Sequence, residues 1–263
     1  MEVFLNPDAW IALITLTFLE IVLGIDNIIF ISIATGKLPE ESRKKATKIG
    51  MFLAMFMRIF LLLGISYLIA MKEPWFSIDF SWMTAQVSGQ SIILLLGGLF
   101  LIYKSTNEIR EKVDHKGEEE QEIKKAAAKT FSSVIVQIIL IDIVFSFDSI
   151  LTAVGMTNGV AGALYIMITA VIISVLIMMQ FAVPVGSFVN RHPSIQILGL
   201  AFLILIGLML VTESAHLSNA LIFGSHVTPI PKGYLYFAIS FSLMVEALNM
   251  KATKKSNTHQ LRI

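Results

Sequence analysis

The chain is 263 residues long, and 56% of them are apolar while only 15% are charged. An ordinary soluble domain carries roughly 25% charged residues, so this composition argues against a soluble protein and favours one surrounded by lipid. The formal net charge of +1 does not indicate nucleic-acid binding, and a chain without cysteine has no disulfides, thiolate metal sites or cysteine nucleophiles.

Seven segments are apolar over approximately the length that a membrane-crossing helix needs, which is about 20 residues. In chain order they cover residues 9–34, 49–71, 88–104, 131–153, 160–186, 195–213 and 234–250. The third and the seventh are the shortest. The sequence therefore predicts an all-α membrane protein with about seven transmembrane helices.

The basic residues are concentrated in alternate loops. Of the 20 lysines and arginines, 17 lie in segments 35–48 and 104–130, at Arg191, or in the tail after residue 250. Only Lys72 and Lys232 fall on the other side, and Arg58 lies within a span. Because basic loops stay in the cytoplasm, we expect a multi-pass membrane protein with its N-terminus outside and its C-terminus in the cytoplasm.

Two acidic motifs form an internal repeat. Residues 20–29 read Glu-Ile-Val-Leu-Gly-Ile-Asp-Asn-Ile-Ile, and residues 142–151 read Asp-Ile-Val-Phe-Ser-Phe-Asp-Ser-Ile-Leu. Three spans and a cytoplasmic loop separate the copies, so the two halves are expected to be inverted in the membrane. Inverted repeats are typical of transporters, in which the site lies near the midplane.

The predicted organisation follows from the repeat. It comprises a first three-helix repeat over 1–104, a charged cytoplasmic loop over 105–130, a second, inverted three-helix repeat over 131–213, an external loop over 214–233, a seventh helix over 234–250 and a cytoplasmic tail over 251–263. The aromatic residues of the 72–87 loop indicate an aromatic belt at the outer membrane interface.

The repeated motifs place several carboxylates inside the bilayer, where each charged side chain costs at least about 2.5–3.5 kcal/mol. Such groups must face one another, water or a cation. The candidate metal ligands are Glu20, Asp26, Asn27, Asp142, Asp148 and Ser149. Because these ligands offer only oxygen, they suit Mg²⁺, Ca²⁺ or Mn²⁺ and disfavour Cu(I) or Zn²⁺.

The spacing within the first motif raises a geometric problem. Positions i and i+6 are about 240° apart on a straight helix, so Glu20 and Asp26 would not share a face. A local break of the helix near Gly24 would bring them together with Asn27, and the glycine favours such a break.

Four further polar residues are candidates for charge balance or gating. Arg58 lies near the middle of the second span and needs a partner, and the repeat offset places it opposite Gln180 of the fifth span. Glu213 closes the sixth span on the outer side, and Glu246 lies near the inner end of the seventh. Simple interfacial placement is the alternative for these two acids.

The strings Glu20-x-x-Leu-Gly-Ile-Asp26-Asn27 and Asp142-x-x-Phe-Ser-Phe-Asp148-Ser149, together with Arg58 and the surrounding spans, resemble the TerC family of integral membrane proteins over about residues 5–250. This resemblance implies a bacterial inner-membrane protein of a family named for tellurite resistance and associated with manganese efflux and with metalation of exported proteins. It also implies that the acidic motif positions bind the ion.

We therefore expect a transporter that exports a hard divalent cation, with Mn²⁺ as the candidate and exchange with protons as a hypothesis. It would have no permanently bound cofactor and no enzymatic activity, and its partners would be the lipid bilayer and the transported ion. One alternative is a membrane scaffold that works with the secretion machinery to metalate or fold secreted proteins. Another is an intramembrane aspartyl protease. A purely structural alternative pairs the central acids with Arg58 or Lys104.

Overall fold

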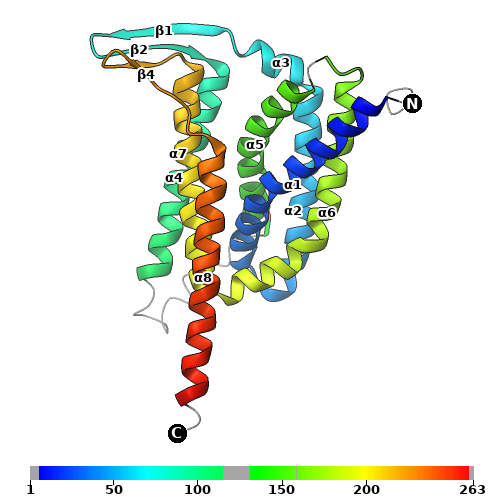
Figure 1. Cartoon of the computed structure of the whole chain (residues 1–263), viewed down its shortest axis with the longest axis vertical. Coiled ribbons are helices and arrows are strands. Elements are labelled where there is room, and N and C mark those ends of the chain that lie inside the picture. The colour runs from blue at the N-terminus through cyan, green and yellow to red at the C-terminus, as the bar shows by residue number, and fades with distance from the viewer. Residues whose placement is uncertain (1–5, 115–130, 158, 261–263) are drawn as a thin grey trace.

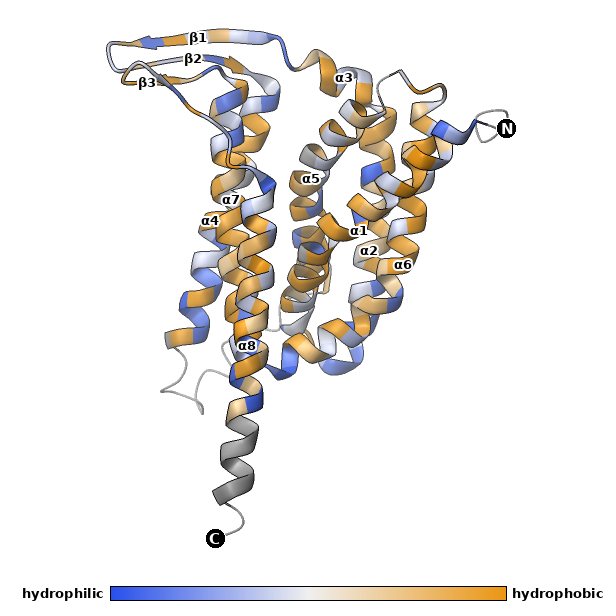
Figure 2. Ribbon diagram, in the orientation of Figure 1, coloured by the Kyte–Doolittle hydropathy of each residue, from blue (hydrophilic) through white to orange (hydrophobic). Residues whose placement is uncertain are grey.

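The computed structural model describes residues 6–114, 131–157 and 159–260, apart from the side chains of Asp26, Asp114, Asp148 and residues 253–260. Within these residues, six helices are long and apolar enough to cross a membrane. They are α1 (Pro7–Gly36), α2 (Glu40–Leu63), α4 (Gly89–Asp114), α5 (Phe131–Met156), α6 (Ala163–Arg191) and α7 (Pro193–Leu217). Figure 2 shows that their middle sections are mostly hydrophobic, while hydrophilic residues gather towards the helix ends.

Helix α1 begins where the local sequence favours a helix start. Asn6 accepts a hydrogen bond from the backbone N–H of Asp8 through its side chain, at 3.0 Å, and Pro7 occupies the first turn. An asparagine cap satisfies one of the free N–H groups of the first turn, and proline is tolerated there because its missing N–H would have no partner. The apolar run that follows keeps the helix continuous to Gly36.

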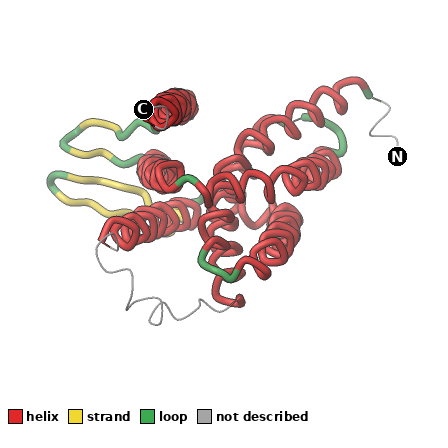
Figure 3. The backbone as a smooth tube through the Cα atoms, turned by 90° about the horizontal axis from the view of Figure 1, so that it is seen from below, coloured by secondary structure: helices red, strands yellow, loops and turns green. Residues whose placement is uncertain are grey.

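The helices form two groups that touch along one side (Figures 1 and 3). In the first group α1 packs on α6, α2 packs on α5, and the α1–α5 and α2–α6 contacts close the core. In the second group α4 packs along α7. Contacts of α4 with α5 and of α1 with α7 join the two groups.

Helices α4 and α7 approach each other closely at two glycines. A Cβ atom on Gly98 would lie 2.6 Å from the carbonyl oxygen of Gly207, and one on Gly207 would lie 2.7 Å from the carbonyl oxygen of Gly98. Both distances are too short for a real contact, so only glycine permits the two backbones to meet here. Small residues at crossing points are the usual means by which membrane helices pack.

The chain directions can be followed in Figure 1. Helix α1 descends from the end that carries the N-terminus, whereas α5 ascends towards that end. The helices that contain the two acidic motifs therefore run in opposite directions. A two-fold relation between the halves remains a prediction.

The predicted seventh span corresponds to part of helix α8 (Lys232–Gln260), which packs on α7. Its existence as a helix agrees with the prediction, but in the described part of the chain it is not among the helices apolar enough to cross a membrane. Its crossing of the bilayer thus stays a prediction.

A small antiparallel sheet covers the end of the α4–α7 pair and was not predicted from the sequence. Its strands are β1 (Pro74–Phe80), β2 (Met83–Ser88), β3 (Leu221–Ile222) and β4 (Ser225–His226), in the order β1-β2-β3-β4. Phe76 pairs with Val87 and Met83 with Ile222. The sheet joins the two segments expected to be external loops and lies at the same end as the N-terminus (Figure 1).

The aromatic side chains of the predicted belt lie on this sheet and the turns beside it. Phe80 stacks on Trp82, with ring centroids 6.4 Å apart, and Trp82 lies 6.2 Å from Phe223 of the β3–β4 turn. All three side chains are exposed. The short helix α3 (Ile65–Ala70) connects α2 to the sheet.

Two helix ends differ from the sequence-based boundaries. Helix α4 continues to Asp114, so the first part of the segment expected to be a loop from residue 105 is helical. Residues 115–130, the remainder of that segment, lie outside the described part of the chain. Helices α6 and α7 are separated only by His192, although we expected a loop over 187–194.

Candidate functional site

Residues from three helices meet in an ion-pair network inside the first helix group. Arg58 of α2 forms an ion pair with Glu20 of α1, and its Nη2 lies 3.5 Å from Oδ1 of Asp142 on α5. The Nε of Arg58 donates a hydrogen bond to Oγ of Ser146, at 2.9 Å. The Ser146 hydroxyl in turn donates to Oδ2 of Asp142, at 3.0 Å.

Helical spacing explains why Ser146 takes part. It lies one turn after Asp142 on α5, so both side chains face the same neighbour. Its hydroxyl can accept from the guanidinium and donate to the carboxylate at once. Ser146 is not among the site residues predicted from the sequence; the i, i+4 spacing from an intramembrane acid is the feature that points to it.

The network is almost completely shielded from solvent. The side chains of Arg58, Glu20 and Asp142 are 5%, 5% and 9% exposed. Buried charges are tolerated only where they are paired and hydrogen-bonded. One guanidinium facing two carboxylates leaves one formal negative charge among these three residues, so the structural alternative of pairing with Arg58 accounts for Glu20 and Asp142 only in part.

Asn27 of α1 extends the network. Its Nδ2 donates to Oδ1 of Asp142, at 3.4 Å, so the first acidic motif contacts the second directly. Its Oδ1 is buried and has no hydrogen-bond partner within the described part of the chain. Because an ionised carboxylate only accepts, the amide nitrogen must face Asp142, and the amide oxygen is left facing elsewhere. A buried acceptor without a donor is unusual in a folded protein.

Two small cavities adjoin these residues. One, of about 20 Å³, is bordered by Asn27, Arg58 and Asp142, and the other, of about 60 Å³, by Asn27, Arg58 and Ser149. A cavity needs roughly 10–15 Å³ to hold one water molecule. The space beside Asn27 therefore accommodates one to a few water-sized groups.

Helix α8 closes the larger cavity. Lys232, Leu235 and Tyr236 line it, and Nζ of Lys232 donates to Oγ1 of Thr152 on α5, at 3.2 Å. The sequence analysis placed Lys232 on the outer side without assigning it a role. Lys232 lies at the N-terminal end of the predicted seventh span and beside the second half of α5. That proximity depends on tertiary packing, so the spacing of residues in the sequence could not predict it.

The remaining motif residues are placed as follows. Ser149 is buried and donates to the carbonyl oxygen of Ser146, at 3.2 Å. Asp26 and Asp148 lie within α1 and α5, but their side chains are outside the described set. Their predicted role as ligands stays a prediction. Among described residues, no group of three or more His, Cys, Asp and Glu side chains is arranged to hold a metal ion.

The expected break at Gly24 was wrong, because α1 is helical without interruption from Pro7 to Gly36. Gly24 instead allows close packing on α6, where an added Cβ would collide with the sulfur of Met178. Glu20 and Asp142 still come together, because Arg58 reaches both from a third helix.

The other candidates for charge balance do not join the network. Gln180 is exposed on α6, so the repeat offset does not make it a structural equivalent of buried Arg58. Glu213 of α7 and Glu246 of α8 are both half-buried. Their gating role remains a prediction.

A second ion-pair cluster joins α1 to α4 at the opposite end from the sheet. Glu108, which is 3% exposed, pairs with Lys37 and also with Lys104, at 2.9 Å, one turn earlier on α4. Lys37 also reaches Glu111, at 3.3 Å. Glu108 falls within the predicted charged cytoplasmic segment 105–130, and its burial follows from the packing of the extended helix α4.

Residues 5–260 match the model of the integral membrane protein TerC family. The chain is 47% identical over 251 residues to the UPF0053 inner membrane protein YgdQ of Escherichia coli, covering 95% of this chain and 96% of that protein. It is 45% identical over 246 residues to a UPF0053 protein of Haemophilus influenzae, covering 94% and 95%. The UPF0053 inner membrane protein YoaE of E. coli is 42% identical over 261 residues, which are 99% of this chain but 46% of that longer protein.

No solved structure matches the chain. The match to the family model covers almost the whole sequence, and relatives of similar length are named inner membrane proteins. Together with the six long apolar helices, this establishes a multi-pass membrane protein. The chain belongs to the integral membrane protein TerC family.

Proposed function

We propose that this chain transports a hard divalent cation across the membrane and that the ion binds beside Asn27 and Asp142. The observation that carries the proposal is the meeting of the two repeated motifs in the bundle interior. There, the buried amide oxygen of Asn27 has no partner among described residues, and the amide nitrogen of the same side chain donates to the Asp142 carboxylate. A dehydrated cation is a natural partner for both oxygens.

The charge of the site supports a cation. Glu20 and Asp142 together carry one negative charge more than Arg58 neutralises. Asp26 and Asp148 lie on the same two helices and would add to this surplus. Four carboxylates and one guanidinium leave about three negative charges, which a divalent cation would reduce to about one. Exchange of the cation for protons follows as a hypothesis from this surplus.

The available space bears on which ion is preferred. The cavity beside Asn27 and Asp142 has a volume of about 20 Å³, close to that of one water molecule. A cation there must give up most of its hydration shell and take protein oxygens instead. Mg²⁺ loses its waters reluctantly, so the space favours Mn²⁺ or Ca²⁺. Mn²⁺ is the cation that the family resemblance implies, and we propose it as the substrate.

The test is metal flux into proteoliposomes that contain a metal-sensitive dye, measured for Mn²⁺, Ca²⁺, Mg²⁺ and Co²⁺. The Asp142→Asn variant and the Asp26→Asn/Asp148→Asn double variant preserve side-chain shape but remove charge, and each should reduce Mn²⁺ flux by at least about tenfold. Asp79→Asn, on exposed strand β1, is the matched control and should retain full flux. Undiminished Mn²⁺ flux in the double variant would defeat the proposal.

A further inference from the structure

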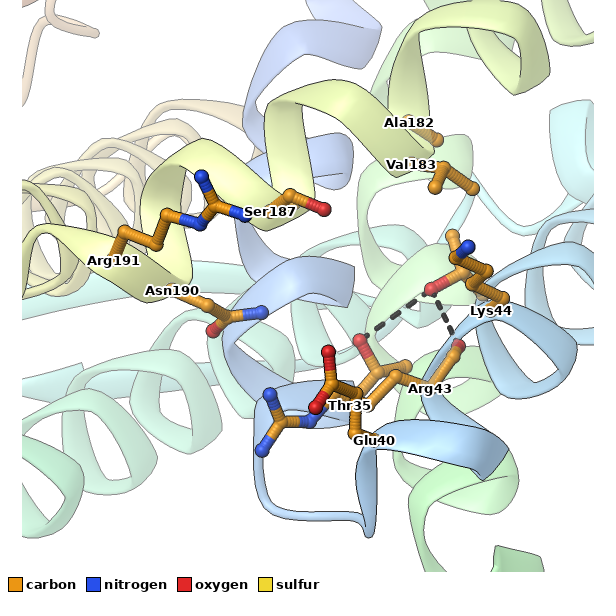
Figure 4. Close-up of a pocket in the computed structure, with 11 residues that line it drawn as sticks. Thr35, Glu40, Arg43, Lys44, Ala182, Val183, Ser187, Asn190 and Arg191 are labelled. Carbon is orange, nitrogen blue, oxygen red and sulfur yellow. Dashed lines mark hydrogen bonds between the residues drawn. The ribbon is translucent and has the colours of Figure 1, made fainter.

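A third cavity, larger than the two beside Asn27, lies at the opposite end of the bundle from the sheet, between the end of α1, the start of α2 and the last turns of α6 (Figure 4). Its volume is about 230 Å³. Arg43, Lys44 and Arg191 border it, with Glu40 as the one acidic residue. It is distinct from the candidate ion site, with which it shares no lining residue.

The basic side chains of this cavity are available to a ligand. Among the described residues, none of Arg43, Lys44 and Arg191 forms an ion pair with a carboxylate, although Glu40 lines the same cavity. Arg43 uses its Nε to donate to the carbonyl oxygen of Leu38, at 2.8 Å, which fixes the guanidinium at the edge of the cavity. Three cations and one anion leave two formal positive charges around the space.

Neutral donors complete the lining. Ser187 and Asn190 of α6 point towards the interior in Figure 4. The Asn190 Oδ1 accepts from Gln196, at 3.4 Å, which leaves the amide nitrogen turned towards the cavity. Gly36 makes room for this side chain, because a Cβ there would lie 2.5 Å from Asn190 Oδ1.

The base of the cavity offers no competing ligand. The Thr47 hydroxyl donates to the carbonyl oxygen of Arg43, at 2.9 Å, and that of Thr35 donates to the carbonyl oxygen of Ile31, at 2.8 Å. The Thr47 hydroxyl also lies 3.4 Å from that of Thr35, so both hydroxyl groups are engaged by protein groups. The free donors of the cavity are the cationic groups and the α6 side chains, an arrangement that suits the oxygens of a phosphate.

The position of the cavity relates it to the membrane surface. Lys44 lies in the second turn of α2 and Arg191 ends α6, so both lie where the apolar spans end. Basic pockets in this position between membrane helices bind lipid head groups.

We propose that this cavity binds a phosphate-bearing anion, either the headgroup of an anionic phospholipid or free phosphate. The test uses the full chain purified in a neutral detergent. Its melting temperature is measured with phosphatidylglycerol, with phosphatidylcholine of the same acyl chains, and with inorganic phosphate against chloride at equal ionic strength. Native mass spectrometry counts the lipids that stay bound.

A matched pair of double variants separates the cavity from general surface charge. Lys44→Gln/Arg191→Gln removes two cavity cations, and Lys45→Gln/Lys48→Gln removes two exposed lysines of the same region of α2 that do not line the cavity. We expect the first pair to weaken binding by at least about tenfold and the second by less than about threefold. Glu40→Gln should strengthen binding, because it removes the one anion of the lining.

The outcomes are distinct. Stabilisation by phosphatidylglycerol alone assigns the cavity to a lipid headgroup, and stabilisation by inorganic phosphate as well assigns it to free phosphate. Equal loss of binding in the two double variants, or no stabilisation by any phosphate compound, overturns the proposal.

Discussion

Arg58 and Asp142 lie on different helices and in different halves of the chain, yet the guanidinium Nη2 is 3.5 Å from the carboxylate Oδ1. The same guanidinium pairs with Glu20, the residue that corresponds to Asp142 in the other motif. One arginine, which belongs to neither motif, therefore connects the two. The stability of the bundle and the charge of the candidate ion site both depend on it.

Replacing Arg58 by glutamine should strongly destabilise the protein. Breaking a buried ion pair by removing one partner typically costs about 3–5 kcal/mol, because the other charge remains buried and unpaired. Thermal unfolding in detergent, followed by intrinsic fluorescence, measures the loss. The double variant Arg58→Gln/Glu20→Gln removes one of the uncompensated carboxylates and should recover part of the stability. A single variant as stable as the parent would show that the network contributes nothing.

The hydroxyl of Ser146 should matter more than that of Ser149, three residues further along α5. Ser146→Ala removes the hydroxyl that accepts from Arg58 Nε and donates to Asp142. This loss should cost about 1–3 kcal/mol of unfolding free energy. Within the described residues Ser149 donates to a carbonyl of its own helix, so Ser149→Ala should cost less than about 1 kcal/mol. Chemical denaturation of both variants in the same detergent makes the comparison, and equal losses would contradict it.

Helix packing between α4 and α7 should be sensitive to a single methyl group. A Cβ on Gly98 would lie 2.6 Å from the Gly207 carbonyl oxygen, so Gly98→Ala forces the two backbones apart and should destabilise by about 1–3 kcal/mol. Gly155→Ala on α5 is the matched control, because nothing lies within 4 Å of its added Cβ. That change should be neutral or stabilising by about 0.5–1 kcal/mol. Equal melting temperatures for the two variants would rule out a tight contact.

Much of the helical architecture could be predicted from the sequence, because each span is a long apolar run and lipid requires the backbone to satisfy its hydrogen bonds internally. The four-stranded sheet was missed, since β2 and β3 are brought together by the α4–α7 pair and not by nearby sequence. Aromatic residues such as Trp75 and Trp82 were interpreted only as membrane-interface anchors, although they are also frequent in strands.

The candidate site was predictable in its residue types but not in its contacts. The repeat identified Glu20, Asn27 and Asp142, and the charge of Arg58 indicated a need for partners. The geometry of the contacts depends on which helices pack together, so the uninterrupted helix α1 and the exposed position of Gln180 could not be deduced from spacing. Ser146 and Lys232 are polar residues of ordinary appearance until the fold places them.

The orientation of the chain can be tested by single-cysteine labelling, because the natural sequence contains no cysteine. With the basic loops in the cytoplasm, Ser77→Cys on exposed β1 should react with an impermeant maleimide added to intact cells. Lys45→Cys at the start of α2 should react only after permeabilisation. Lys251→Cys on α8 should also require permeabilisation if this helix crosses the membrane. Labelling of Lys251→Cys from outside would show that α8 does not cross, which leaves the six long apolar helices as the crossing ones.

The amide of Asn27 provides a test in which stability and function should separate. Asn27→Leu keeps the side-chain volume and removes both the hydrogen bond to Asp142 and the buried oxygen that has no partner in the described part of the chain. Losing the hydrogen bond costs about 0.5–1.5 kcal/mol, and removing an unsatisfied buried acceptor returns about 1–3 kcal/mol. The variant should therefore be as stable as the parent or slightly more stable.

If the oxygen is a cation ligand, Mn²⁺ affinity should nevertheless fall by about tenfold, equivalent to ~1.4 kcal/mol. Asn27→Asp keeps an oxygen and adds charge, so it should preserve or raise the affinity. Calorimetric titration of Mn²⁺ together with thermal unfolding decides the matter. A destabilised Asn27→Leu variant with unchanged Mn²⁺ affinity would assign the amide a purely structural role.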